Sequence, residues 1–218
     1  DSLLKSDYSN FEVIFVDNNS SDNSIEIVKN KFPQARIIIN KKNLGFARAN
    51  NVGIKQASGD AYLLLNNDTI IHPELISVLS KELFGSEQIG IVGPKIYFLE
   101  KGKKPETQKI IWFAGGKINW QKTESLHIGR DKRDNDYVDD KKEVDFITGC
   151  ALMVKKEVVD KIGLLEKRFF MFYEDADWCQ RAKQAGYRVF YIPFGGVWHL
   201  KSVTASKHIF NKNNNKIK

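Results

Sequence analysis

The sequence has few cysteines: Cys150 and Cys179 are the only two among 218 residues. Two cysteines cannot build a disulfide framework or a four-thiolate zinc site, so we expect free thiols in a reducing compartment. Long apolar runs are also missing, because none approaches the roughly 20 residues that a membrane-spanning helix needs. We expect no signal peptide at the start of the chain either. These absences favour a cytoplasmic protein.

Acidic residues are outnumbered, with 27 Asp and Glu against 34 Lys and Arg, and the net charge is +7. Residues 207–218 contain four lysines and no acid, and they lack apolar periodicity. We expect one domain over 1–206 and a flexible basic tail over 207–218. The tail either is attracted to an anionic membrane or an anionic acceptor, or is simply solvated. No nucleic-acid partner is expected, because no basic helix with interleaved aromatic residues occurs.

Short strands and helices alternate along the first half of the chain. Apolar runs predict strands at 11–16, 35–39, 61–65 and 89–92, and helical spacing predicts helices at 24–32, 45–57 and 73–84, the last with an apolar stripe of Ile76, Leu79 and Leu83. Further candidates are strands at 110–113, 117–120 and 188–192 (the last ended by Pro193), helices at 155–162 and 175–185, and a loop around 129–142. This alternation predicts an α/β fold with a mostly parallel central sheet and helices on both faces.

Two acidic clusters each follow an apolar run. Asn66-Asn67-Asp68 follows the predicted strand 61–65, and Glu174-Asp175-Ala176-Asp177 follows five apolar or aromatic residues. A carboxylate at a strand end can bind a divalent cation together with substrate phosphates. A carboxyl beside apolar side chains can have a raised pKa and act as a base. The alternatives are a turn for the first cluster and a helix start for the second, with Asp177 paired to Arg181.

Other polar residues also follow predicted strands. Asp17-Asn18-Asn19 follows the strand at 11–16, so it should face the crevice at the carboxyl ends of the strands. Asp17 can then contact a ribose or a base edge, or it can serve as a turn or cap residue. In the segment 43–53, Gly45 permits close backbone approach and Arg48 can pair with a phosphate. The alternative is an exposed Arg beside a packing glycine.

His199 follows another apolar stretch near the end of the predicted domain. A lone histidine is usually structural, and this one becomes a metal ligand only if the chain folds back beside Asp68. The four tryptophans are expected to belong mostly to the core.

Several motifs occur in a fixed order: Val16 to Asp22, Asn43 to Gly53, Asn66-Asn67-Asp68, Thr148-Gly149-Cys150-Ala151, Glu174 to Arg181, and Trp198-His199. Together they resemble glycosyltransferase family 2, most closely its rhamnosyltransferase and galactofuranosyltransferase-like branch. The resemblance covers roughly residues 1–206.

The resemblance implies a fold of the GT-A type and a set of site residues. Asp175 would be the catalytic base, and Glu174 would help to hold the acceptor. Asp68 would bind Mg²⁺ or Mn²⁺, with His199 as a second ligand. The donor-binding set would be Asp17, Asn19, Asn43, Gly45, Arg48 and Asn67.

Two departures from the family pattern stand out. Asn66 replaces the first carboxylate of the family's Asp-x-Asp motif. The family's opening strand and its Pro-x-x-Asn turn are absent, and the first five residues resemble the end of the family's first helix. In the family that strand lies between the strands that end here at Asp17 and Asp68. We therefore expect an opening at this place in the sheet.

The resemblance implies an inverting glycosyltransferase. The sugar would move from a UDP- or dTDP-linked donor to a hydroxyl of a saccharide or lipid-linked acceptor, in cell-surface polysaccharide synthesis. The protein would be cytoplasmic, with or without peripheral attachment to the inner face of the membrane. The alternative is a non-catalytic fragment that binds nucleotide sugars or serves as a scaffold.

Overall fold

The computed structural model describes residues 1–134 and 140–200. The predicted tail at 207–218 lies outside the described residues. None of the helices in the described part combines the length and the apolar character that crossing a bilayer requires.

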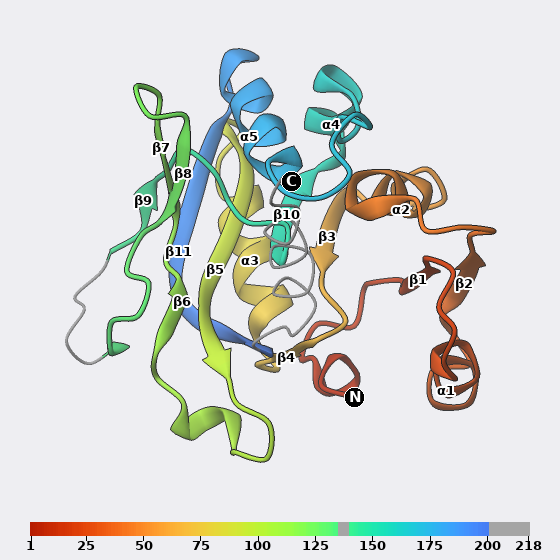
Figure 1. Ribbon diagram of the computed structural model, residues 1–218. Coiled ribbons are helices and arrows are strands. Elements are labelled where there is room, and N and C mark those ends of the chain that lie inside the picture. The colour runs from red at the N-terminus through yellow and green to blue at the C-terminus, as the bar shows by residue number, and fades with distance from the viewer. Residues whose placement is uncertain (135–139, 201–218) are drawn as a thin grey trace, which may run out of the picture.

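A seven-stranded sheet forms the centre of the molecule (Figure 1). Its main strands follow the order β3, β10, β5, β11, β4, while β6 pairs with β5 and β9 with β11. The bounds are β3 (Ala61–Leu65), β4 (Thr69–Ile71), β5 (Ile89–Leu99), β6 (Ile111–Phe113), β9 (Lys142–Glu143), β10 (Ala151–Lys155) and β11 (Arg188–Leu200).

The expectation of a mostly parallel sheet is wrong for these strands. Only the pairing of β5 with β11 is parallel, whereas β10 is antiparallel to both β3 and β5, and β11 is antiparallel to both β4 and β9. All five residues of β10 are buried. A strand covered on both faces is an apolar run in either direction, so its composition carries no information on direction.

A second, two-stranded sheet stands beside the first. β1 (Ile14–Asp17) and β2 (Arg36–Ile39) pair in parallel and are joined by α1 (Ser24–Lys31). Figure 1 shows this unit at the right, beyond β3. A third pair is the antiparallel hairpin of β7 (Gly116–Asn119) and β8 (Glu124–His127). Two short 3₁₀ turns lie at Leu3–Lys5 and Pro105–Thr107.

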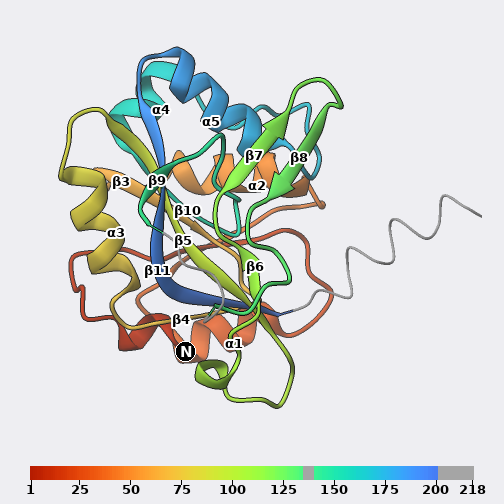
Figure 2. The same ribbon diagram turned by 90° about the vertical axis from the view of Figure 1, so that its left-hand side faces the viewer.

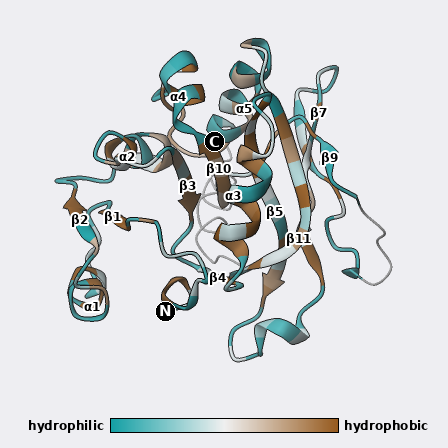
Figure 3. Ribbon diagram, turned by 180° about the vertical axis from the view of Figure 1, so that it is seen from behind, coloured by the Kyte–Doolittle hydropathy of each residue, from teal (hydrophilic) through white to brown (hydrophobic). Residues whose placement is uncertain are grey.

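The larger helices lie on both sides of the central sheet. α3 (Leu75–Phe84) is on one side and α2 (Gly45–Ile54) on the other (Figure 2). α4 (Lys156–Ile162) packs on β10, and α5 (Glu174–Gln184) packs on β5 and β11. The predicted apolar stripe of α3 is confirmed, since Ile76, Leu79 and Leu83 are buried. Hydrophobic residues concentrate in the central strands, and the outer turns are largely hydrophilic (Figure 3).

β11 extends well beyond the predicted end of its strand. We expected Pro193 to end the strand at 192, but β11 continues to Leu200. Its register against β5 shifts between Ile192 and Gly195 and again between Gly195 and Val197. Such bulges accommodate proline and glycine inside a strand. The extension carries His199 into the ladder opposite Thr69 of β4.

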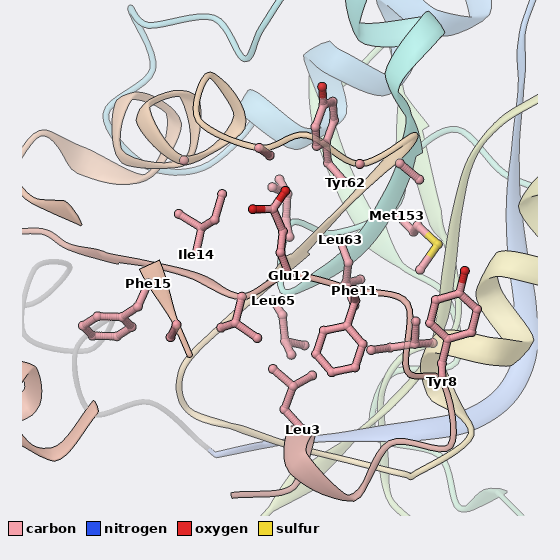
Figure 4. Close-up of a pocket in the computed structure, with 18 of the residues that line it drawn as sticks. Leu3, Tyr8, Phe11, Glu12, Ile14, Phe15, Tyr62, Leu63, Leu65 and Met153 are labelled. Carbon is pink, nitrogen blue, oxygen red and sulfur yellow. The ribbon is translucent and has the colours of Figure 1, made fainter. Parts of the chain in front are cut away.

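A cavity of about 910 Å³ separates β1 from β3. Its walls include residues 11–16 on one side and 61–67 on the other. Figure 4 shows Leu3, Phe11, Ile14, Leu63 and Leu65 gathered around it. Among the described strands, β1 pairs only with β2, and β3 pairs only with β10. This apolar slot therefore lies between the strands that end near Asp17 and Asp68, where we expected an opening.

Candidate functional site

Asp68 and His199 meet at the end of β3. Asp68 lies in the turn between β3 and β4, and its backbone carbonyl accepts a hydrogen bond from Leu200 N at 2.9 Å. The Oδ1 atom of Asp68 is 3.1 Å from Nε2 of His199. That oxygen is buried and makes no hydrogen bond, so the two atoms are close without being aligned as donor and acceptor. Two metal ligands that both point at the position of one metal ion are arranged in this way.

This pair fits a divalent metal that also binds phosphate. In the described part of the chain no third His, Cys, Asp or Glu joins the pair to make a three-ligand cluster. Mg²⁺ commonly takes one or two carboxylates and completes its shell with water and substrate phosphates. The Trp112 ring lies 4.6 Å from the His199 ring, centroid to centroid, and limits its rotation. Asp68 and His199 can therefore hold Mg²⁺ or Mn²⁺ once a diphosphate supplies further oxygens.

Asp175 is fixed at the start of α5 by backbone groups. Its Oδ2 accepts a hydrogen bond from Gly149 N and its Oδ1 accepts one from Ala176 N, both at 2.8 Å. Burial raises the pKa of Asp175, while these hydrogen bonds and one from the Thr148 side chain act in the opposite direction. The carboxylate is thus held in one orientation and binds a proton more readily than an exposed aspartate does.

Glu174 is more deeply buried than its neighbour, with 4% of its surface exposed. Burial raises the pKa of Glu174 from 4.5 to about 7. Its Oε2 makes no hydrogen bond within the described structure. A carboxyl that titrates near neutral pH and has an unused oxygen can exchange a proton with a ligand. The other helix-start acid, Asp177, pairs with Arg181 at 2.8 Å as predicted.

The metal pair and the acid pair lie on either side of the turn 148–150. The pKa of the Cys150 thiol is raised well above its usual value, chiefly by burial and further by the charges of Asp68 and Asp175. Both carboxylates are therefore near the same thiol. Asn66 N also donates to Cys150 O at 3.0 Å, which joins the end of β3 to this turn. Asp68, His199, Glu174 and Asp175 thus belong to one region.

Asp17 is buried at the end of β1, and its two carboxylate oxygens differ in their surroundings. Its Oδ2 accepts hydrogen bonds from Asn19 N and Ser20 N, both at 3.1 Å, as a turn residue would. Its Oδ1 is buried and has no partner in the described structure. The turn interpretation explains one oxygen of Asp17, and the other remains available to a ligand.

Asn18, which was not among the predicted site residues, joins β1 to the start of α2. Its side chain donates to Asn43 Oδ1 at 2.8 Å and accepts from Leu44 N at 2.9 Å. Asn43 Oδ1 also accepts from Gly45 N at 2.9 Å. The side-chain oxygen of Asn43 is therefore committed to this network. The contact with a nucleotide-sugar donor that we predicted for Asn43 can therefore use only the NH₂ group of its side chain.

Gly45 and Arg48 hold a loop of the chain itself. Gly45 has φ 77°, and a Cβ there would lie 2.3 Å from Phe170 O. Arg48 Nε donates to Lys167 O at 3.0 Å. Phe170 thus makes a close approach at Gly45, and the contact of Gly45 with a nucleotide-sugar donor stays a prediction.

The remaining predicted residues, Asn19 and Asn67, lie at the ends of β1 and β3. Asn19 has a left-handed backbone with φ 67°, and Asn67 is exposed at the end of β3. The 910 Å³ cavity reaches this region through Val16, Asn66, Asn67 and Thr69, and it includes none of Asp17, Asp68, Asp175 and His199. The cavity therefore does not contain the four side chains to which we assigned the nucleoside contact, the metal and the base.

Sequence reasoning missed the supports of the site. Thr148 and Gly149 hold Asp175, and Trp112 packs on His199 although we expected it in the core. A signal for the first two was present, since Thr148-Gly149-Cys150 is one of the ordered motifs. Nothing in the sequence around Trp112 indicates its partner.

Comparison with known proteins gives a consistent result. A sequence model described as glycosyl transferase family 2 matches residues 1–163. A rhamnosyltransferase of Mycobacterium tuberculosis, named N-acetylglucosaminyl-diphospho-decaprenol L-rhamnosyltransferase, is 24% identical over 87% of this chain. A protein of Sinorhizobium fredii is 25% identical over 90% of it. The chain spans 66% of the first relative and 22% of the second.

Among solved structures, that of GalNAc-T7 with UDP, GalNAc and Mn²⁺ aligns with a TM-score of 0.70 at 14% identity. The alignment covers 91% of this chain and 40% of the other. At this identity the likeness shows a shared fold.

Proposed function

This chain belongs to glycosyltransferase family 2, and on that basis we propose that it transfers a sugar, with inversion, from a nucleoside diphosphate donor to an acceptor hydroxyl. The family resemblance noted from the sequence is confirmed, and the fold is of the GT-A type. The observation that carries the proposal is that one turn contacts both clusters: Gly149 N donates to Asp175, and Asn66 N, two residues before Asp68, donates to Cys150 O. A metal-binding carboxylate and a proton-accepting carboxylate are then near enough to serve one reaction.

The donor side of the proposed reaction uses three groups. Asp17 contacts the nucleoside through its unpartnered Oδ1. Asp68 and His199 would hold Mg²⁺ or Mn²⁺, which stabilises the negative charge on a diphosphate leaving group. We propose UDP- or dTDP-linked sugars as donors, and the UDP and Mn²⁺ in the GalNAc-T7 structure support this class. We assign Asn19, Asn43, Gly45, Arg48 and Asn67 to the same donor-binding set.

The acceptor side uses the two acids of α5. Asp175, oriented by Gly149 N, takes the proton of the acceptor hydroxyl while the oxygen attacks the anomeric carbon. Glu174 holds the acceptor through its unpartnered Oε2. We propose a saccharide or lipid-linked acceptor in cell-surface polysaccharide synthesis, and the name of the mycobacterial relative supports a lipid diphosphate. Such an acceptor favours a cytoplasmic protein attached peripherally to the inner face of the membrane.

The test is donor binding and turnover measured on the same preparation. Titration with UDP- and dTDP-sugars, with and without Mn²⁺, should show metal-dependent binding. Asp68→Ala should lose that dependence, with affinity falling roughly 10- to 100-fold. Equal affinity with and without the cation in the unmutated chain would contradict the metal assignment.

The apolar slot beside β1 supports the second candidate, a non-catalytic nucleotide-sugar-binding scaffold. Its walls are the β1 edge and the β3 edge, the strands that carry the donor-binding end of the site. Donor binding without hydrolysis or transfer would favour the scaffold, and turnover with any acceptor would exclude it.

A further inference from the structure

Next to the proposed base, the chain displays a row of uncovered apolar side chains. We call residues 169–173 the aromatic loop. Phe170, Met171, Phe172 and Tyr173 are 57%, 38%, 51% and 52% exposed. Single exposed apolar residues need no explanation, whereas a contiguous group marks an interaction site. Four in a row, directly before Glu174, form such a group.

The backbone of the aromatic loop is anchored while its side chains are exposed. Phe170 O accepts a hydrogen bond from Phe46 N at 2.7 Å, and Phe169 N donates to Glu166 O at 3.2 Å. The Arg48 bond to Lys167 O holds the residues just before the loop. Because the backbone is already ordered, covering the side chains costs little further conformational entropy.

Two residues of the aromatic loop adopt backbone angles that bulky side chains avoid. Phe172 has φ 75° and Tyr173 has φ 70°. The left-handed region is uncommon for residues other than glycine and asparagine, and such strain persists where the surroundings enforce it. The two residues with strained backbones are therefore also residues whose aromatic rings are half exposed.

Exposed basic residues occur next to the aromatic loop in sequence and shortly before its packing partner Gly45. Lys167 is exposed immediately before the aromatic loop. Lys41 and Lys42 are exposed four and three residues before Gly45, the residue against which Phe170 packs. The nearby acid Glu166 is paired with Arg168 at 3.0 Å. Aromatic and methionine side chains together with exposed lysines are complementary to the headgroup region of an anionic bilayer.

We propose that the aromatic loop, with Lys41, Lys42 and Lys167, docks this protein on an anionic membrane surface. The inference rests on the peripheral attachment proposed above and names the surface that makes it. Docking places the acid pair at the membrane, because Glu174 and Asp175 directly follow the loop. A hydroxyl carried on a lipid diphosphate would then reach Asp175 without leaving the headgroup layer.

Vesicle co-sedimentation of the full chain tests this proposal without turnover. Phosphatidylcholine vesicles with and without phosphatidylglycerol are the probe. We expect binding to the anionic vesicles that weakens with salt. Phe172→Asn should reduce the partition coefficient roughly tenfold by removing a half-exposed ring. The same change should raise the melting temperature, because asparagine tolerates a positive φ. A variant that lost binding through misfolding would melt lower.

Charge reversal gives a second arm. Lys167→Glu should reduce the partition roughly 10- to 30-fold, since each basic residue near the surface contributes about 1 kcal/mol. The matched controls are Phe84→Asn and Lys81→Glu on α3, which lies on the side of the sheet away from α2 (Figure 2). Phe84 is 53% exposed, close to the value for Phe172. Neither control should change vesicle binding.

Three outcomes would overturn the proposal. The first is binding by Phe172→Asn and Lys167→Glu equal to the unmutated chain, with binding lost only when the lysines of 207–218 are replaced by glutamine. The second is unchanged vesicle binding of Phe172→Asn with a raised KM for a soluble acceptor, which would assign the rings to the acceptor. The third is no vesicle binding by any variant. If donor binding and transfer persist in that case, the docking surface fails and the proposed reaction stands.

Discussion

The central sheet and the β1–α1–β2 unit differ sharply in packing, although both contribute to the site. All of β10 is buried, and α3 contributes four buried residues. In α1 no residue is buried, and in β1 the only buried residue is Asp17. The well-packed central sheet therefore positions the proposed base and the proposed metal ligands. The weakly packed β1–α1–β2 unit positions Asp17, the proposed nucleoside contact.

In the weakly packed β1–α1–β2 unit, the buried side chain of β1 is the polar Asp17 rather than an apolar residue. A buried carboxylate oxygen without a hydrogen bond destabilises a fold, so apolar packing does not explain Asp17. The β1–α1–β2 unit also borders the apolar slot. Val28 and Phe32, from the α1 region, line that slot and are only partly buried. Regions with few buried apolar contacts open at low free energy. Donor binding should accordingly order the unit.

The largest effect expected in the well-packed part is on turnover. Asp175→Asn should keep donor affinity and lower kcat about 10²- to 10⁴-fold, because a general base contributes that factor. Single-turnover transfer with saturating donor measures it. Asp177→Asn, which breaks the pair with Arg181, is the matched control and should retain most activity. Unchanged turnover of Asp175→Asn would refute the assignment.

Stability should distinguish the two parts directly. Ile91 is fully buried in β5, and Ile91→Ala should cost about 2–5 kcal/mol of unfolding free energy. Ile38→Ala in the half-buried β2 should cost less than about 2 kcal/mol. Urea titration measures both, and amide exchange should be faster in β1 and β2 than in β5. Equal costs would mean that the two parts pack equally well.

The pH dependence of stability should reveal the buried Glu174. Its pKa is about 7 in the folded chain against an ordinary 4.5, because burial penalises the charged form. The unfolded chain therefore ionises first as pH rises, and stability falls between about pH 4.5 and 7. Glu174→Gln should be more stable than the unmutated chain at pH 8, by up to about 3 kcal/mol, and equal to it at pH 4.

The exposed Glu157→Gln is the control for that measurement and should show no such pH dependence. A constant difference between Glu174→Gln and the unmutated chain at all pH values would contradict the raised pKa.

The smallest effect is expected in the weakly packed unit. Asp17→Asn keeps the size of the side chain and removes the charge of its unpartnered oxygen. Donor KM should rise about tenfold, while kcat at saturating donor stays within about twofold, because a uniform binding contact affects KM alone. Steady-state kinetics over a donor series measures this. A fall in kcat with unchanged KM would place Asp17 in the chemical step.

The sequence by itself determined the local elements and the order of the motifs. Strand β3 was predicted with the bounds that it has, and the helical stripe of α3 is buried as expected. Both follow from periodicity, which is a property of neighbouring residues. The family was also identifiable, because its motifs keep their order along the chain.

Only the tertiary structure decided the strand directions and the partners of the site residues. β10 is antiparallel to its neighbours although its composition fits either direction. His199 reaches Asp68 because bulges carry β11 past Pro193 and into the ladder with β4. Gly45 turned out to admit Phe170, and Gly149 to orient Asp175. These are contacts between distant segments, and their geometry depends on how the sheet assembles, which local residue patterns do not encode.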